Sequence, residues 1–483
     1  MNKKFRTISN NRILIPLLIM LASMAVRAFY VSYISIYQNQ HDGGVPYSLQ
    51  GHVGYITWFL ENRRLPDFDV RTADQFWHPP LSYALSALLL KAVWTVFPST
   101  NGNIEIAQLL PYLYVTVAIF LIWRILVFFA KEGHELIVNL TLAFVAFQPG
   151  LIIRSAMLNN DALVLVLSIL ALGLAIQWYY SGSWKTMIGT AISFGLAMMA
   201  KKSGAIVALP IAILFIGRFV GILRGKSFAS DTAEVKDGDC KGNKKNIITR
   251  VLFQLAAFLI IAAPIALWWY IRNYALYGVP FDFFWNIQNG WEYEEYLGNI
   301  PALTRITDFD PGHFYYANTY LQYKTNTFQD INPLIALWKS AVSDVWSWTY
   351  ENNKIKKLSY ILLISRTILV LLGTLFIPVF VAGDRTNEEK ENDTPLLRVS
   401  FVSLFVALII LYYSFCFQYP YVWTMDYRYI EIIIMCDAIF LMTFLARIKR
   451  FKVIMIPVTL LIAGFCITSC TFFVLAKGLF GAY

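Results

Sequence analysis

The sequence is poor in charge. Only 14% of its 483 residues are Asp, Glu, Lys or Arg, while 58% are hydrophobic, and the mean hydropathy is +0.54. Soluble domains have roughly a quarter charged residues and about half apolar ones. The chain is therefore too apolar for a soluble globule, and its composition predicts an all-α polytopic membrane protein.

Several motifs are also missing. The five cysteines show no zinc or disulfide spacing, and the chain has no P-loop and no dinucleotide-binding glycine motif. The first apolar run, from Ile13 to about Ile36, is too long for a signal-peptide core and lacks a small-residue cleavage site. We therefore expect no nucleotide site, and an uncleaved first span that follows a cytoplasmic N-terminus.

The net charge is +10, but the basic residues are not gathered in one stripe. They lie at the ends of apolar runs and in short loops, as topology signals do. This distribution argues against a nucleic-acid partner and favours contacts with membrane lipids.

Eleven apolar runs are long enough to cross a bilayer, given about 20 residues per spanning helix. A twelfth, 79–97, begins with two prolines and is interrupted by Lys91, so we predict an interfacial or re-entrant helix there. This assignment keeps the basic segments 224–250 and 447–452 on the cytoplasmic side. Fusing 185–223 into one broken span would have the same effect but would place two lysines within the membrane. The predicted spans are 13–36, 106–129, 136–156, 161–180, 185–200, 203–223, 250–272, 358–382, 398–417, 429–446 and 453–476.

These spans divide the chain into three parts. Residues 1–272 form an N-terminal transmembrane module whose first extracytoplasmic loop is 37–105. Residues 273–357 are predicted to be an extracytoplasmic loop, partly helical and packed on the membrane face, because short amphipathic patterns and many tryptophans occur there. Residues 358–483 supply the C-terminal transmembrane helices.

The segment from Gln38 to Ser82 is unusually polar for its position between apolar runs. It holds three of the five histidines and four aspartates. Such a segment beside a bilayer belongs at the interface or in a wet cavity, which makes it a functional candidate. Within it Asp42 follows the first span, and His78 precedes the helix that Pro79 begins.

The predicted topology places several polar residues near this same membrane face. Carboxylates beside cations suit a site that deprotonates an acceptor hydroxyl and stabilises a departing phosphate. Each residue also has a simpler interpretation, as a turn carboxylate for Asp42, a helix N-cap for Asp161, or a snorkelling lysine. His52 is equally compatible with interfacial packing or a place beside the site. The candidates are Asp42, His52, His78, Asp161, Lys201, Lys202 and Arg428.

Five blocks in this order resemble the GT-C glycosyltransferases that use polyprenyl-phosphate sugars, among them the protein O-mannosyltransferases and bacterial aminoarabinose transferases. The blocks cover most of the predicted spans, and 273–357 lies outside the resemblance. They are Asp42 after the first span, Gln75-Phe76-Trp77-His78-Pro79-Pro80-Leu81, Arg154 with Asn159-Asn160-Asp161-Ala162-Leu163, Gly195-Leu196-Ala197-Met198-Met199-Ala200-Lys201-Lys202-Ser203-Gly204, and Asp426-Tyr427-Arg428-Tyr429.

The resemblance implies a GT-C fold, with a role for each matching residue. Asp42 matches the aspartate taken as catalytic base or acceptor-orienting group, and His78 stands close to where relatives hold the donor phosphate. Asp161 is implied to help position acceptor or phosphate. Lys201 or Lys202, and Arg428, would face the lipid phosphate. This chain differs from many relatives at the position after Asp42, where they have Glu and it has Gly43. Its glycines would let the backbone approach the sugar, and a divalent cation is left open.

We therefore predict a membrane glycosyltransferase that transfers a sugar from a polyprenyl-phosphate donor to an extracytoplasmic protein, lipid or cell-envelope glycan. The modest size of 273–357 favours a bacterial plasma membrane. The alternatives are a transporter or flippase of lipid-linked sugars, and an oligosaccharide polymerase or ligase. A transporter predicts inverted repeats and charges within the membrane. The sequence shows neither a convincing repeat nor a pair of charges at mid-span.

Overall fold

A computed structural model describes most of the chain. The part of the chain it describes is helical apart from an isolated bridge between Tyr296 and Tyr421, which confirms the all-α prediction. The cytoplasmic N-terminus expected from the sequence lies outside the described residues, as do 284–295, 310–329 and 345–352 of the predicted loop 273–357. The described ranges are 13–38, 40–224, 240–283, 296–309, 330–344, 353–383 and 395–480.

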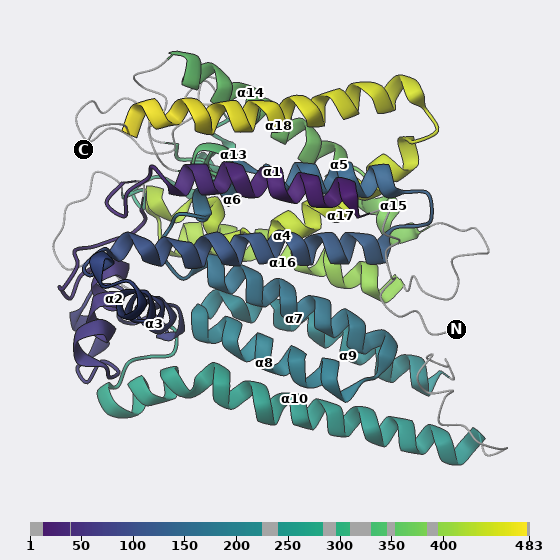
Figure 1. Cartoon of the computed structure of the whole chain (residues 1–483). Coiled ribbons are helices and arrows are strands. Elements are labelled where there is room, and N and C mark those ends of the chain that lie inside the picture. The colour runs from purple at the N-terminus through teal and green to yellow at the C-terminus, as the bar shows by residue number, and fades with distance from the viewer. Residues whose placement is uncertain are drawn as a thin grey trace.

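Long helices run side by side in a bundle (Figure 1). Among the described residues, eight helical segments are long and apolar enough to cross a membrane, so the protein is a multi-pass membrane protein. Three of these segments include a short neighbouring helix: η4 (Ile104–Gln108) before α4, η5 (Lys202–Val207) before α9, and α15 (Ile377–Ala382) after α14. The main helices are α1 (Leu14–Val31), α4 (Leu109–Phe129), α7 (Asp161–Ser181), α9 (Ala208–Leu223), α10 (Cys240–Tyr277), α14 (Asn353–Thr374), α16 (Pro395–Gln418) and α18 (Lys452–Phe480).

The expected eleven spans are thereby corrected to eight, or nine if a bent pair is counted as one. The range 136–156 is not one helix, because α5 (Glu135–Ala146) stops before Pro149, which begins the short α6 (Pro149–Arg154). The range 185–200 forms α8 (Trp184–Ala200), which has only 17 residues. The range 429–446 falls on α17 (Ile433–Ile448), which is bent by 59° from the segment Val422–Ile430.

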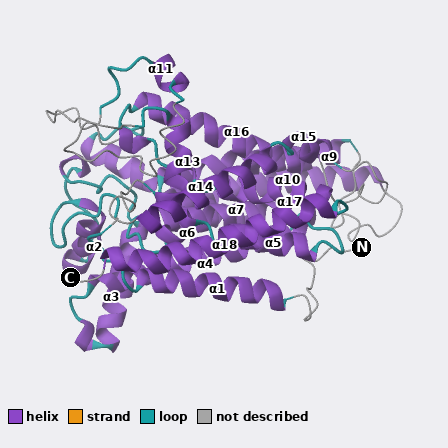
Figure 2. Ribbon diagram, turned by 90° about the horizontal axis from the view of Figure 1, so that it is seen from above, coloured by secondary structure: helices purple, strands orange, loops and turns teal. Residues whose placement is uncertain are grey.

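Two shorter helices, α2 (Gly51–Asn62) and α3 (Leu81–Val96), lie across one end of the bundle. In Figure 1 they are seen nearly end-on, and in Figure 2 they again lie at the end opposite α15. They pack through aromatic rings, with the Tyr55 and Tyr83 centroids 4.2 Å apart. This arrangement agrees with an interfacial helix at 79–97 rather than another span.

The buried centre of the bundle is α17, where every side chain from Ile433 to Leu441 is buried. The outer helices expose large apolar side chains instead, such as Ile260 of α10 at 72% and Leu460 of α18 at 65%. An apolar outer surface is what a lipid-facing bundle requires. The ends of α6 and α8, the start of α7 and the short helix η8 (Tyr427–Ile430) all reach the end of the bundle that α2 and α3 cover, since their side chains contact one another there.

Candidate functional site

Asp42 is held by backbone contacts between its loop and the start of α2. Its carbonyl accepts a hydrogen bond from the His52 N–H at 2.9 Å, and the Gly43 carbonyl accepts one from the Val53 N–H at 2.8 Å. These bonds satisfy two amide groups that a helix N-terminus leaves unpaired. Gly44 and Gly51 have positive φ and their backbones touch, so a Cβ on either would clash. The structure thus uses Gly44 and Gly51 to pack the loop on α2, and the expected approach of the sugar to this backbone stays a prediction.

The Asp42 side chain is 47% exposed, and its carboxylate lies 3.6 Å from Arg428 Nη2. Desolvation by the surrounding protein tends to raise the pKa of Asp42, but the nearby basic groups, Arg428 foremost, together outweigh it and bring the pKa below its usual value. Asp42 is therefore ionised at neutral pH and open to solvent.

Arg428 is buried and contacts three carboxylates. Besides Asp42, its Nε lies 3.0 Å from Asp426 Oδ2 and its Nη1 lies 3.9 Å from Asp161 Oδ2. The Asp426 carboxylate also accepts a hydrogen bond from the Arg428 N–H at 3.0 Å, which caps η8. The guanidinium is thus fixed from both its backbone and its side chain.

Asp161 is the first residue of α7 and is buried among three cations. Lys201 Nζ donates to one oxygen, and Arg154 Nη1 lies 3.7 Å from the other, which Arg428 also approaches. The N-cap position belongs to Asn160, and the Asp161 side chain makes no capping bond. Of our two interpretations of Asp161, the structure contradicts the N-cap.

Glu431 extends this network and was not identified from the sequence. Arg154 Nε donates to Glu431 Oε2 at 3.1 Å, and both side chains are buried. Arg154 therefore joins α6 to both α7 and the segment before α17. Arg154 belongs to a block quoted above, but Glu431 carries no sequence signal beyond its place three residues after Arg428.

Lys201 and Lys202 make different contacts. Lys201 reaches Asp161 and lies over the Tyr429 ring, 5.3 Å from its centroid. Lys202 points away and donates to the Phe281 carbonyl at 2.7 Å. Lys202, one of the predicted site residues, therefore lies outside the cluster.

His52 and His78 form an aromatic wall near the charged groups. Their ring centroids are 5.9 Å apart, and His52 Nδ1 lies 2.8 Å from the Tyr83 hydroxyl. Burial lowers the pKa of His52 to about 4 and holds the pKa of His78 well below its ordinary value. Both rings are neutral at pH 7, so His78 offers a hydrogen bond rather than a positive charge. Its Nδ1 is buried and has no hydrogen-bond partner among the described residues.

A second group of buried residues could hold a metal ion. His41 Nε2 lies 2.6 Å from Asp344 Oδ1 and 3.3 Å from Asp426 Oδ2, and one ligand atom from each residue lies within 4.8 Å of the other two. Imidazole with carboxylates suits zinc, manganese or iron. A bound divalent ion there would supply Lewis acidity and positive charge. From the sequence we left a divalent cation open, and none of these three residues was predicted as a ligand.

The charge of the described cluster favours such an ion. Its five carboxylates outnumber its three permanent cations, so the cluster can take up further positive charge, as protons or as a metal ion. Two buried carboxylates that share one imidazole nitrogen need a positive charge between them. A divalent cation would supply it, as would a proton held within the group.

We expect the purified protein to bind one Mn²⁺ or Zn²⁺ per chain, and Asp344→Asn to weaken this binding by about tenfold or more, because it removes a charged ligand. Titration calorimetry measures the affinity. Asp67→Asn, which changes an exposed carboxylate paired with Arg64, is the matched control. Failure of both metals to bind the wild-type protein at millimolar concentration would contradict a metal site and leave a proton between these groups.

Comparisons with known proteins give a distant likeness among solved structures. No family model matches the chain, and no curated protein matches it. Among solved structures, it is similar to the archaeal oligosaccharyltransferase AglB from Archaeoglobus fulgidus, in complex with an inhibitory peptide and a dolichol-phosphate. The identity is 12%, the TM-score is 0.47, and the match covers 96% of this chain and 56% of that one. The chain thus spans about half the length of the protein it matches.

Proposed function

We propose that this protein is a membrane glycosyltransferase of the GT-C type, which transfers a sugar from a polyprenyl-phosphate donor to an acceptor hydroxyl on the extracytoplasmic side. The observation that supports this most directly is the pairing of a half-exposed carboxylate, Asp42, with the buried guanidinium of Arg428 at 3.6 Å. A proton acceptor thus lies beside a fixed cation, the arrangement that displacement of a phosphate by a hydroxyl requires.

The reaction follows from these positions. The acceptor oxygen attacks the anomeric carbon while its proton passes to Asp42, and inversion is expected. The bond between that carbon and the phosphate oxygen breaks, and its electron pair stays with the leaving lipid phosphate. Arg428 and Lys201 stabilise the negative charge on this phosphate. Neutral His52 and His78 hydrogen-bond donor hydroxyl groups, and the rings beside them provide flat apolar surfaces for the sugar.

The charge distribution argues against a transporter. The sequence led us to expect no charge pair within the spans, but Arg366 of α14 and Asp437 of α17 lie 3.9 Å apart and are buried. This pair adjoins the site, because the Arg366 guanidinium lies over the Tyr427 ring at 4.8 Å. Asp437 lies one turn into α17, so among the described residues this pair extends the charged end of the bundle.

The test is an assay in reconstituted vesicles with a panel of polyprenyl-phosphate sugars and candidate acceptors. We expect release of polyprenyl phosphate with one donor, coupled to sugar appearing on the acceptor. Movement of intact donor between leaflets, without cleavage of the sugar–phosphate bond, would instead support a flippase.

Lys201→Gln should lower kcat/KM for transfer by about 10²- to 10³-fold, because it removes a charge that stabilises the leaving phosphate. Lys202→Gln is its matched control, since the adjacent lysine donates to the Phe281 carbonyl and lies outside the cluster, and it should leave transfer unchanged. Equal loss in the two variants would mean that the lysines contribute general charge rather than a defined contact.

A further inference from the structure

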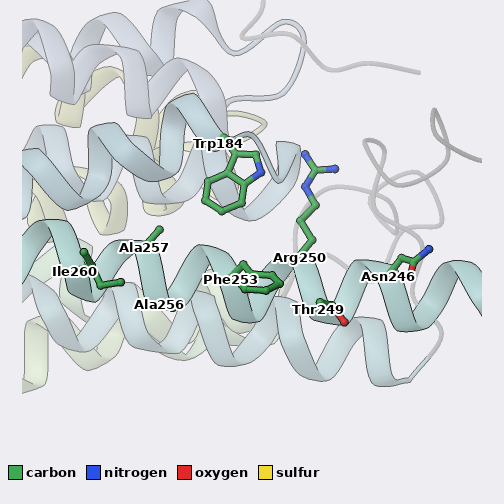
Figure 3. A pocket seen from close by; sticks show the side chains of 8 residues that line it. All are labelled: Trp184, Asn246, Thr249, Arg250, Phe253, Ala256, Ala257 and Ile260. Atoms are coloured by element: carbon green, nitrogen blue, oxygen red, sulfur yellow. The ribbon is translucent and has the colours of Figure 1, made fainter.

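A groove between α8 and α10 lies at the end of the bundle opposite the candidate site. Its volume is about 610 Å³. In Figure 3, Trp184 at the start of α8 lies above one face of α10, and the Arg250 side chain rises from that face beside it. The lining residues are Trp184, Asn246, Thr249, Arg250, Phe253, Ala256, Ala257 and Ile260.

The seven residues from α10 recur at spacings of three and four, so they form one stripe along the helix. The stripe changes character along its length. It is polar from Asn246 to Arg250 and apolar from Phe253 to Ile260. Phe253 and Ile260 are 64% and 72% exposed, so this apolar half faces the surroundings of the bundle rather than its core.

The position of the groove within the membrane follows from the length of α10. Arg250 and Arg272 are 22 residues apart, or about 33 Å at 1.5 Å per residue, close to the roughly 30 Å of a bilayer's hydrocarbon core. Arg272 lies at the end of the candidate site, where its Nη2 donates to the Pro66 carbonyl. Arg250 is therefore at the opposite headgroup level. Ile260 is ten residues deeper, about 15 Å, which is near the middle of the membrane.

We propose that this groove binds one anionic phospholipid from the leaflet opposite the candidate site, with the phosphate at Arg250 and an acyl chain along α10 towards Ile260. The groove has the length of one leaflet and the polarity of a lipid, with its charged end at the headgroups. Its charge is complementary as well, because exposed Lys185 and Lys245 directly adjoin lining residues. A guanidinium binds phosphate through two parallel hydrogen bonds.

The lipid phosphate would lie beside a contact that ties α10 to α7. Arg250 Nη2 donates to the Gly182 carbonyl at 3.2 Å, and Gln254 Nε2 donates to the same oxygen at 2.8 Å. Gly182 ends α7, the helix whose first residue is Asp161. The small side chains of Ala256 and Ala257 leave space along the apolar half of the groove.

The test uses the full chain reconstituted with spin-labelled phosphatidylglycerol or phosphatidylcholine, and electron paramagnetic resonance measures the motionally restricted lipid. We expect the wild-type protein to restrict phosphatidylglycerol preferentially. Arg250→Gln should reduce this preference about fivefold, as expected for one basic residue at an anionic membrane surface. Arg224→Gln, an exposed arginine just after α9 and outside the groove lining, should leave it unchanged.

Ala257→Phe tests the groove without touching Arg250 or its bond to Gly182. By filling the apolar half, it should bring the restriction of phosphatidylglycerol down to that of phosphatidylcholine. Leu259→Phe, on the same helix but outside the lining and 55% exposed, should have no effect. Equal restriction of both lipids by the wild type, or a preference that survives both groove variants, would overturn the proposal. A dimer that Ala257→Phe alone dissociates would also overturn it and assign the groove to a second copy.

Discussion

Asp42→Asn should reduce sugar transfer by about 10²- to 10⁴-fold, the usual contribution of a general base, while leaving the fold intact. Asn is the informative replacement because Asp42 has a φ of 51°, a left-handed conformation that Asp and Asn tolerate better than other non-glycine residues. The side chain is half exposed, so losing its contact with Arg428 should cost little stability. The rate of transfer in vesicles and the unfolding temperature of the same preparation are the two measurements.

Asp67→Asn is the control for this experiment, since it makes the same change in the same polar segment at an exposed carboxylate paired with Arg64. It should transfer sugar at the wild-type rate. A transfer rate of Asp42→Asn equal to that of Asp67→Asn would remove Asp42 as the base. Glu431 would then be the next carboxylate to test, although the described structure buries it against Arg154.

The fold class was predictable because composition and apolar runs report directly on the membrane. The ends of the spans were less predictable, because they depend on where a helix is interrupted within an apolar run. Pro149 divides what hydropathy presents as one run, and a bend of 59° precedes α17 inside the predicted span 429–446. Hydropathy averages over such breaks, whereas backbone geometry responds to single residues.

The candidate site was predictable where polar residues stand out against an apolar background. Asp42, Asp161 and Arg428 were identified in this way, and the structure brings them together. His41 and Asp344 illustrate the limit. They are 303 positions apart, and Asp344 follows α13 (Pro333–Ser343), in a region without a recognisable motif. Only the folded chain shows that the two side chains meet.

The two adjacent lysines could not be told apart from the sequence. Lys201 and Lys202 have the same chemistry and the same predicted depth, but α8 ends between Ala200 and Lys201, and the next helical segment turns the following side chain away. Which lysine meets Asp161 depends on where the helix stops. Helix ends are the least certain part of a prediction from sequence.

The largest effect on stability is expected at Asp161. Asp161→Asn would leave Lys201, Arg154 and Arg428 without one of their shared counter-charges, and breaking a buried pair in this way costs about 3–5 kcal/mol. Asp67→Asn, which breaks a surface pair, should cost about 1 kcal/mol or less. Chemical unfolding of the detergent-solubilised protein measures both.

A double-mutant cycle tests the contact between Lys201 and Asp161. Lys201→Gln should lower the free energy of unfolding much less in the Asp161→Asn background than in the wild type, with a coupling of about 0.5–3 kcal/mol, because the lysine then loses no partner. Additive effects of the two substitutions would show that Lys201 and Asp161 do not interact, and the charged cluster at the centre of the proposed site would lose its main support.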